Sequence, residues 1–226
     1  MRLNKFLSLT LNLSRRASDD LIASGVVTLN QEIAQLGNRV EPEQDIVQVN
    51  GKKVTLTEIK PTYLLLNKPT GYLSSKVSQG GVPTVYELLP KEFQDLNLNI
   101  AGRLDKDTCG LILLTNDGNY LNKITHPGFN KQKTYTVRLN KEVSAEDLEK
   151  LKSGVQIGES RPSSFESIKI IGPSELEVVL TEGRNRQIRR TFWELGCKVT
   201  FLKRTQMGDH KLEDLEEGQT KLVQDP

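Results

Sequence analysis

The apolar run LILL at residues 111–114 constrains the fold of this chain most, because polar, glycine-containing turns stand on both sides of it. A short apolar run between turns is typical of a strand buried in a sheet. In the turn before it, GRLDKD, Asp105 stands two positions after Arg103, and the turn after it, NDG at 116–118, is typical of a hairpin connection. The pattern predicts a rigidly held loop that presents a carboxylate beside a guanidinium, and functional residues are common in such loops.

Composition limits the class of protein. The chain has 226 residues, of which 27% are charged and 36% hydrophobic, as is typical of a globular protein with one large domain or a large and a small one. No apolar run has the length of a transmembrane helix, and the N-terminal apolar residues are spaced as in a helix, with no cleavage site after them. We therefore expect a cytoplasmic protein whose N-terminus belongs to the fold.

Few residue types are available for cofactor chemistry. The two cysteines, Cys109 and Cys197, and the two histidines, His126 and His210, support neither a disulfide framework nor a zinc site. The sequence has no glycine-rich phosphate loop and no GxGxxG motif. We expect no metal and no cofactor, so that any chemistry rests on carboxylates, arginines and tyrosines.

The net charge of +2 hides an uneven distribution. Residues 61–204 carry 21 basic and 16 acidic side chains, whereas residues 205–226 carry 2 basic and 6 acidic ones. A basic body suits a polyanionic partner, since lysine and arginine neutralise phosphates. The totals alone favour ordinary solvated surface, so the local clusters must decide.

Residues 1–55 have the pattern of a small module with two helices followed by short strands. Leu3, Phe6 and Leu7 share one helical face, Ser14 is suited to cap a second helix, and Gly25 is suited to end it. Short strands are predicted at 26–29 and 45–49, with a hairpin turn at 50–51. Periodicity is lost at 55–62, where we place the linker, so the predicted domains span residues 1–58 and 59–226.

The larger domain contains more predicted strands than helices. Many of its elements are joined by short turns, so the predicted fold class is α+β with a largely antiparallel sheet. Strands are predicted at 63–66, 111–114, 133–139, 168–171, 176–181 and 199–202, and helices at 85–89, 120–124, after Ser144 and at 185–195.

Two clusters of basic residues point to an anionic ligand. In TEGRNRQIRR, residues 181–190, four arginines stand where a strand is predicted to become a helix. Backbone N–H groups at a helix N-terminus attract anions, and arginine forks bind phosphates or carboxylates. The alternative is a solvated, arginine-rich helix face, because charge runs usually lie on surfaces. The second cluster belongs to the small module and suits a phosphate backbone; it contains Arg2, Lys5, Arg15, Arg16, Lys52 and Lys53.

Two further features stay ambiguous on local sequence. Tyr135 alternates with Val137 and Leu139 on a predicted strand, so a core tyrosine is its ordinary interpretation. Asp105 also has a structural alternative, because an aspartate in a turn often accepts hydrogen bonds from backbone N–H groups. Asp107 suits that role equally well, and spacing does not choose between the two acids.

The motifs together resemble two known families. Residues 1 to about 50 resemble an S4 RNA-binding domain, through RL at 2–3, SRRA at 14–17, LI at 21–22, SG at 24–25 and VTLN at 27–30. That family usually has Asp and Gly where this chain has Asn4 and Gln31. From residue 63 to about 223 the chain resembles the RsuA/RluB family of bacterial ribosomal RNA pseudouridine synthases, through LLLNKPTGY, GRLDKDTCGLILLTNDG, KTYTV and EGRNRQIRR in that order.

The resemblance implies roles for individual residues. Asp105 falls on the catalytic aspartate, Tyr135 on the tyrosine that stacks on the target base, and Arg189 on the arginine that pairs with the aspartate, which leaves Asp107 as a turn or capping residue. The implied fold is a mixed, mostly antiparallel sheet flanked by helices, preceded by a small S4 domain, and known members use no cofactor. RNA binding is assigned to Arg2, Lys5, Arg15, Arg16, Lys68, Arg103, Arg184, Asn185, Arg186, Gln187 and Arg190.

The implied activity is the isomerisation of a flipped uridine in ribosomal RNA to pseudouridine. The motif EGRNRQIRR behind an S4 domain favours large-subunit over small-subunit RNA. The expected partner is structured ribosomal RNA within an assembling subunit, without a membrane, and the enzyme is expected to be a monomer. The alternatives are a non-catalytic RNA-binding ribosome-assembly factor on the same scaffold, and an arginine-rich protein that binds DNA or an acidic protein. The sequence leaves open whether Asp105 attacks C1′ or removes the C2′ proton.

Overall fold

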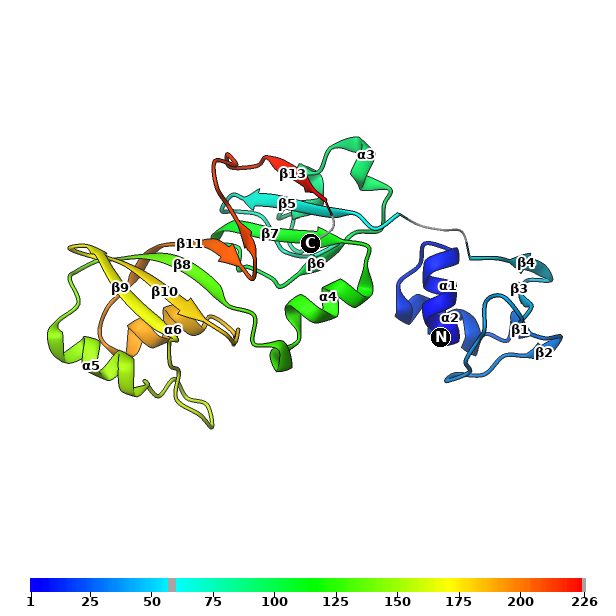
Figure 1. The fold of residues 1–226 in the computed structure, drawn as a ribbon, viewed down its shortest axis with the longest axis horizontal. Coiled ribbons are helices and arrows are strands. Elements are labelled where there is room, and N and C mark those ends of the chain that lie inside the picture. Colours follow the sequence, from blue (N-terminus) through cyan, green and yellow to red (C-terminus); the bar gives the residue numbers. More distant parts are fainter. Residues whose placement is uncertain (57–59, 225–226) are drawn as a thin grey trace. The chain divides into compact units, whose positions relative to one another are not determined.

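The computed structural model describes residues 1–56 and 60–224, and the chain forms two compact units, Met1–Lys60 and Pro61–Pro226 (Figure 1). The domain boundary predicted between residues 58 and 59 lies outside the described residues. Among the described helices, none is long and apolar enough to cross a lipid bilayer.

The N-terminal unit contains two helices and a four-stranded antiparallel sheet in the order β2-β1-β3-β4. The Ser14 hydroxyl accepts a hydrogen bond from the Ala17 amide and so caps the second helix, as predicted. Positive φ angles at Asn50 and Gly51 form the predicted hairpin turn. The elements are α1 (Leu3–Thr10), α2 (Arg15–Ala23), β1 (Val27–Leu29), β2 (Glu32–Ile33), β3 (Val47–Val49) and β4 (Lys52–Val54).

The second unit is built on a mixed sheet in the order β13-β5-β7-β11-β8-β10-β9, with β6 paired to β7 and β12 paired to β11. Among the described strands only β7 and β11 pair in parallel, so β11 is the seam between two antiparallel halves. The strands are β5 (Tyr63–Lys68), β6 (Asn99–Ala101), β7 (Cys109–Thr115), β8 (Lys133–Leu139), β9 (Ser167–Gly172), β10 (Glu175–Leu180), β11 (Val199–Met207), β12 (His210–Lys211) and β13 (Thr220–Val223). The helices are η1 (Val85–Leu88), α3 (Lys91–Gln94), α4 (Gly118–Thr125), η2 (Pro127–Phe129), α5 (Ala145–Ser153) and α6 (Gln187–Glu194).

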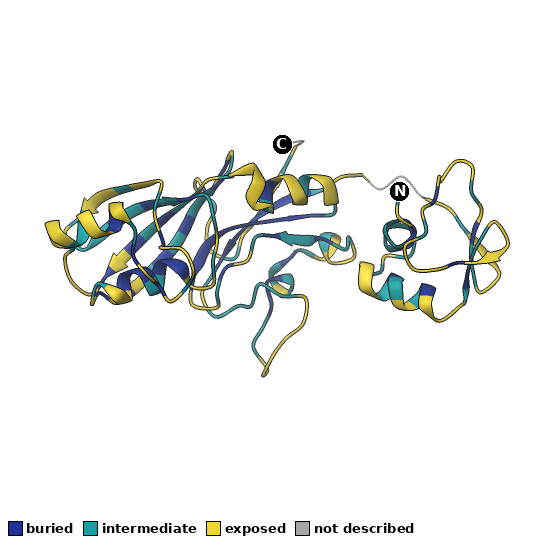
Figure 2. Ribbon diagram, turned by 90° about the horizontal axis from the view of Figure 1, so that it is seen from below, coloured by how far each residue is buried: buried dark blue, intermediate teal, exposed yellow. Residues whose placement is uncertain are grey.

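The apolar run at 111–114 lies at the centre of this sheet, in β7, as predicted. Each of its four residues is at most 1% exposed. Ile112 and Leu114 pack in the larger core with residues of α5 and α6, whereas Leu111 and Leu113 pack in a second core with α4. Both faces of β7 are therefore covered, which explains a continuous apolar run in place of an alternating one. Figure 2 shows dark, buried stretches along the strands of this unit, alternating with intermediate ones.

Several element ends differ from the expectations, and three of them matter most here. Residues 116–118 do not form a hairpin, because Asp117 instead caps α4 and accepts hydrogen bonds from the amides of Asn119 and Tyr120. α6 begins later than predicted, because Arg186 stands before it in a left-handed conformation with φ of 47°. β11 continues to Met207, beyond the predicted end at residue 202.

Candidate active site

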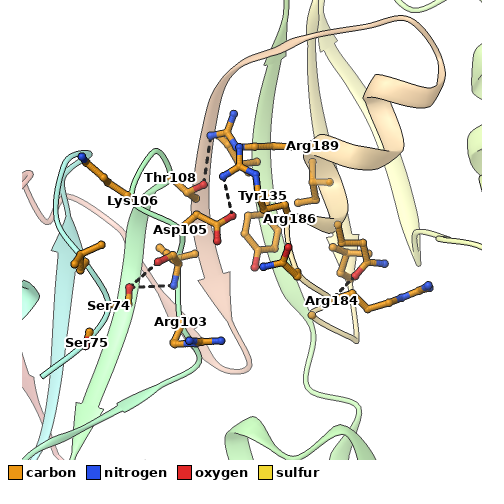
Figure 3. A pocket seen from close by; sticks show the side chains of 18 of the residues that line it. Ser74, Ser75, Arg103, Asp105, Lys106, Thr108, Tyr135, Arg184, Arg186 and Arg189 are labelled. Carbon is orange, nitrogen blue, oxygen red and sulfur yellow. Dashed lines mark hydrogen bonds and ion pairs between the residues drawn. The ribbon is translucent and has the colours of Figure 1, made fainter. Parts of the chain in front are cut away.

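Three segments distant in sequence meet at a cavity of about 650 Å³ in the second unit (Figure 3). They are the loop after β5, the loop before β7 that carries the GRLD motif, and the residues leading into α6; β8 supplies one wall. The cavity brings together Asp105, Tyr135 and Arg189, the three predicted catalytic residues. Five of the predicted RNA-binding residues also line it, namely Arg103, Arg184, Asn185, Arg186 and Gln187.

The basic residues predicted to bind RNA in the small module belong to the N-terminal unit. Three of them, Arg2, Arg15 and Arg16, are exposed, and Lys5 is partly buried. They keep the solvent access that a phosphate contact requires.

Lys68 was predicted to bind RNA, but the structure shows that it holds the Asp105 loop instead. Lys68 is 0% exposed, and its ammonium donates hydrogen bonds to the carbonyl oxygens of Pro69 (3.0 Å), Asp105 (3.2 Å), Lys106 (3.5 Å) and Thr108 (2.8 Å). Burial lowers the pKa of Lys68 to about 8, although nearby negative groups oppose this shift. An ammonium enclosed in this way cannot reach a phosphate, and the prediction for Lys68 is wrong.

Ser74 holds the same loop from another segment and was missed by the sequence analysis. Its hydroxyl donates to the Leu104 carbonyl (2.8 Å) and accepts from the Leu104 amide (3.1 Å), as Figure 3 shows. These two bonds fix the backbone immediately before Asp105. The only signal in the sequence was a polar pair, Ser74-Ser75, soon after a buried strand, and that signal is weak.

Arg186 contacts both acids of the loop. Its two terminal nitrogens donate to the two carboxylate oxygens of Asp107 at 3.0 and 2.9 Å, and Nη1 lies 3.7 Å from Oδ2 of Asp105. The hydrogen bonds from Arg186 are the main reason that the pKa of Asp107 is lowered. Asp105 has a less exposed side chain than Asp107, 36% against 48%, but it lines the cavity, and no described residue donates a hydrogen bond to its carboxylate. It is the acid that remains open to a ligand in the cavity.

The predicted ion pair between Asp105 and Arg189 is not formed in this structure. Arg189 instead places Nε 3.3 Å from Oδ2 of Asp107, and Nη2 donates to the Asp107 carbonyl at 2.7 Å. Arg186 precedes the helix in a left-handed conformation, and its guanidinium takes the position beside Asp105. Arg189 lies within α6, donates to the Val199 carbonyl (3.2 Å) and is only 13% exposed, so that burial lowers its pKa. Asp107, predicted to be a turn residue, thus receives both arginines.

Tyr135 lies on β8 and is 8% exposed. Its neighbours across the sheet are Val178 of β10 and Arg204 of β11. The ring belongs to the core but also lines the cavity, next to the loop with Asp105 (Figure 3). A rigid aromatic ring in a cavity wall offers a flat surface on which a planar base can stack.

Two of the arginines predicted to bind RNA form ion pairs with glutamates of the same unit. Arg184 lies 2.5 Å from Glu182 and 3.3 Å from Glu159, and Arg190 lies 2.5 Å from Glu159 but does not line the cavity. The hydrogen bond from Arg190 is the main cause of the lowered pKa of Glu159. Arg103, by contrast, is exposed and has no ion pair within residues 1–56 and 60–224, so its charge remains available to a ligand.

Gln187 and Asn185 differ in their access to a ligand, although both line the cavity. Gln187 is 3% exposed, and its amide donates to Glu182 (2.7 Å) and to the Ser163 hydroxyl (3.1 Å). Gln187 therefore stabilises the wall of the cavity through Glu182 and Ser163, and is too buried for the predicted contact with RNA. Asn185 is exposed and keeps the access that its predicted role requires.

The cavity combines an accessible carboxylate, an aromatic wall and several guanidinium groups. Its floor includes the apolar side chains of Leu104, Leu180, Ile188 and Leu202. In the described part of the chain, no group of three or more His, Cys, Asp or Glu side chains is arranged to hold a metal ion. The arrangement suits a planar, partly apolar ring that is attached to an anionic chain.

The comparisons with protein families agree with the fold. Residues 62–194 match the RNA pseudouridylate synthase family, and residues 1–46 match the S4 domain family. A solved pseudouridylate synthase is 33% identical, with a TM-score of 0.71 over 99% of this chain and 96% of that chain.

Relatives that are similar over most of this chain carry related names. An RNA pseudouridine synthase of Aquifex aeolicus is 36% identical over 97% of this chain and 91% of its own length. The ribosomal small subunit pseudouridine synthase A of Vibrio parahaemolyticus is 36% identical over 95% of this chain and 91% of its own length. The ribosomal large subunit pseudouridine synthase B of Escherichia coli K12 is 35% identical over 92% of this chain and 74% of its own length. By these matches, the chain belongs to the RNA pseudouridylate synthase family and carries an N-terminal S4 domain.

Proposed function

We propose that this enzyme converts uridine to pseudouridine in ribosomal RNA, with Asp105 as the residue that acts on the ribose. The observation that carries this proposal is the position of Asp105, which is the accessible acid of a cavity that Tyr135 also lines. Ribosomal RNA is proposed because both the small-subunit and the large-subunit synthases named above are about one-third identical to this chain.

The reaction needs a carboxylate that stays ionised beside the sugar. The N1–C1′ bond breaks, the uracil turns, a C5–C1′ bond forms, and the C5 proton is lost while N1 gains a proton. Asp105 supports the step either by attack on C1′, forming a covalent bond that breaks when C5 attacks C1′, or by removal of the C2′ proton, which returns to C2′ when the C5–C1′ bond forms. Arg186, with Nη1 3.7 Å from Oδ2 of Asp105, forms an ion pair that orients this carboxylate.

The cavity walls would retain the detached base. A uridine must leave its helix or loop to reach Asp105, which is the base flipping common to enzymes that modify bases. The Tyr135 ring offers a stacking surface, and the leucine side chains of the floor exclude water that would otherwise trap the sugar. Arg103 and Asn185 are exposed and line the cavity, and they would hold the RNA around the target.

Large-subunit RNA is the target that we propose, because the motif at 181–190 behind an S4 domain resembles enzymes that act on that RNA. We propose further that the enzyme acts as a monomer, in the cytoplasm, on RNA in an assembling subunit. The exposed Arg2, Arg15 and Arg16 of the S4 domain would add phosphate contacts that strengthen binding without selecting the uridine.

Asp105→Asn tests the central assignment. We expect loss of pseudouridine formation on ribosomal RNA with RNA binding retained, because the amide is neither a nucleophile nor a base. Asp209→Asn is the matched control, since Asp209 is 93% exposed and does not line the cavity. Pseudouridine formation by Asp105→Asn at the wild-type rate would contradict the assignment.

Mapping pseudouridines in both ribosomal RNAs, with and without the gene, tests the target. We expect one or more sites in the large-subunit RNA to disappear with the gene. Sites lost only from the small-subunit RNA would replace the proposed target. A different result would favour the non-catalytic assembly factor. In that case deletion of the gene removes no pseudouridine from either RNA but impairs ribosome assembly, and the Asp105→Asn variant restores assembly.

A further inference from the structure

Arg204 occupies the seam of the sheet, between the two strands that present the reacting groups. It lies on β11, which pairs in parallel with β7 and antiparallel with β8. In this register Arg204 stands opposite Gly110 on one side and opposite Tyr135 on the other. Its backbone thus links the strand that follows the Asp105 loop to the strand that carries Tyr135.

The Arg204 side chain closes the base of the Asp105 loop. Nε donates to the Leu111 carbonyl at 2.7 Å, and Nη2 donates to the Gly102 carbonyl at 3.0 Å. These two carbonyls stand on either side of the loop that carries Asp105. One planar guanidinium therefore holds both ends of that loop, which a lysine ammonium of shorter reach cannot do with the same geometry.

The packing around Arg204 leaves little freedom to shift. A Cβ atom at Gly110 would lie 2.2 Å from the Arg204 carbonyl oxygen and 2.6 Å from its amide nitrogen. Gly110 also has a φ of +105°, which favours glycine. The close approach of the two backbones fixes where the Arg204 side chain begins, and the hydrogen bonds fix where it ends.

A buried cation without an acid partner is costly for folding. Arg204 is 1% exposed, and none of the described acids forms an ion pair with it. An apolar side chain of similar length would fill the space without the desolvation of a charge. A guanidinium at this position is therefore explained better by its hydrogen bonds to the two ends of the Asp105 loop than by a contribution to the stability of the fold.

We propose that Arg204 is a positioning residue for the reaction, which sets the place of Asp105 relative to Tyr135 by holding both ends of the loop. This inference rests on the proposed role of Asp105. Displacement of a reacting group by about 1 Å costs about 100-fold in rate. Loss of the guanidinium would therefore lower kcat, while the exposed cations that bind RNA would keep KM nearly unchanged.

The test compares Arg204→Met, Arg204→Lys, Leu151→Ala and Asp105→Asn with the wild type in single-turnover and steady-state assays on ribosomal RNA. We expect kcat to fall about 100-fold in Arg204→Met and less in Arg204→Lys, with KM within about threefold. Leu151→Ala removes a fully buried side chain of α5 and is the stability control. It lowers the melting temperature but keeps kcat per folded molecule.

Hydrogen exchange gives a second readout that does not depend on activity. The amides of residues 102–111 should exchange faster in Arg204→Met than in the wild type, and should be unchanged in Leu151→Ala. If Arg204→Met does not fold at the assay temperature, Arg204→Lys is used for the test, and we again expect a lower kcat with KM nearly unchanged. A wild-type kcat in the folded Arg204 variant, while Asp105→Asn is inactive, would overturn the positioning role alone. Activity of Asp105→Asn would instead overturn the proposed function.

Discussion

As the pH rises and Lys68 loses its proton, this enzyme should lose activity and gain stability. In the folded protein burial lowers the pKa of Lys68 from 10.5 to about 8. Protonated, the side chain donates to four carbonyl groups of the Asp105 loop and its surroundings. A neutral amine has one N–H fewer and is a weaker donor, so the loop loosens when Lys68 loses its proton.

The sign and the size of the effect on stability follow from the two pKa values. The unfolded chain keeps the Lys68 proton up to about pH 10.5, whereas the folded chain releases it near pH 8. Between these values the unfolded state binds more protons, so raising the pH favours the folded state. The difference corresponds to about 3 kcal/mol in the free energy of unfolding, accumulated between about pH 8 and about pH 10.5.

Two measurements on the wild type and on Lys68→Met separate this effect from other titrations. Urea unfolding across the alkaline range should show the stability of the wild type rising relative to Lys68→Met by up to about 3 kcal/mol. Pseudouridine formation by the wild type should fall as the pH rises through about 8, and this alkaline limb should be absent from Lys68→Met, whose activity is low at every pH. Lys211→Met, at an exposed lysine, is the control and should match the wild type in both assays.

Equal slopes of stability against pH in the wild type and in Lys68→Met would refute this reasoning. That result would show that Lys68 has the same pKa in the folded and in the unfolded chain. An alkaline limb that persists in Lys68→Met would show that another group controls the activity.

Two further substitutions test the contacts around the cavity. Gly110→Ala places a Cβ atom 2.2 Å from the Arg204 carbonyl oxygen and should cost about 3 kcal/mol or more in urea unfolding, whereas Gly118→Ala, where a Cβ atom meets nothing within 4 Å, should cost little. Asp107→Asn should release Arg186 and strengthen RNA binding severalfold, with a steeper dependence on salt, because a phosphate can replace the carboxylate on the guanidinium. This gain should vanish when Arg186 is changed to Gln, and weaker RNA binding by Asp107→Asn would show instead that Asp107 positions the arginines.

The sequence predicts the fold well where local chemistry decides it. The Ser14 cap, the Asn50-Gly51 turn and the run at 111–114 are each determined by a few neighbouring residues, and the structure contains all three. The hairpin predicted at 116–118 fails for a local reason as well. Asp117 suits a turn and a helix cap equally, and here it caps a helix whose Leu121 and Ile124 pack into the second core.

Partners across the cavity could not be predicted in the same way. The sequence places two aspartates in residues 105–107 and four arginines in residues 184–190, but does not show which pairs with which. That choice depends on the left-handed backbone at Arg186, which brings its guanidinium between Asp105 and Asp107. A non-glycine residue in this conformation carries strain that only the surrounding tertiary structure can impose.

The buried cations change how the charge of this chain should be interpreted. The basic surplus of residues 61–204 suggests a polyanionic partner, but it includes Lys68 and Arg204, which no solvent reaches. Those two cations donate to backbone carbonyls of the Asp105 loop, so their effect is to position one acid and not to attract RNA. We expect the attraction of RNA to come from exposed cations such as Arg103, so that the salt dependence of binding follows the surface charges and not the total.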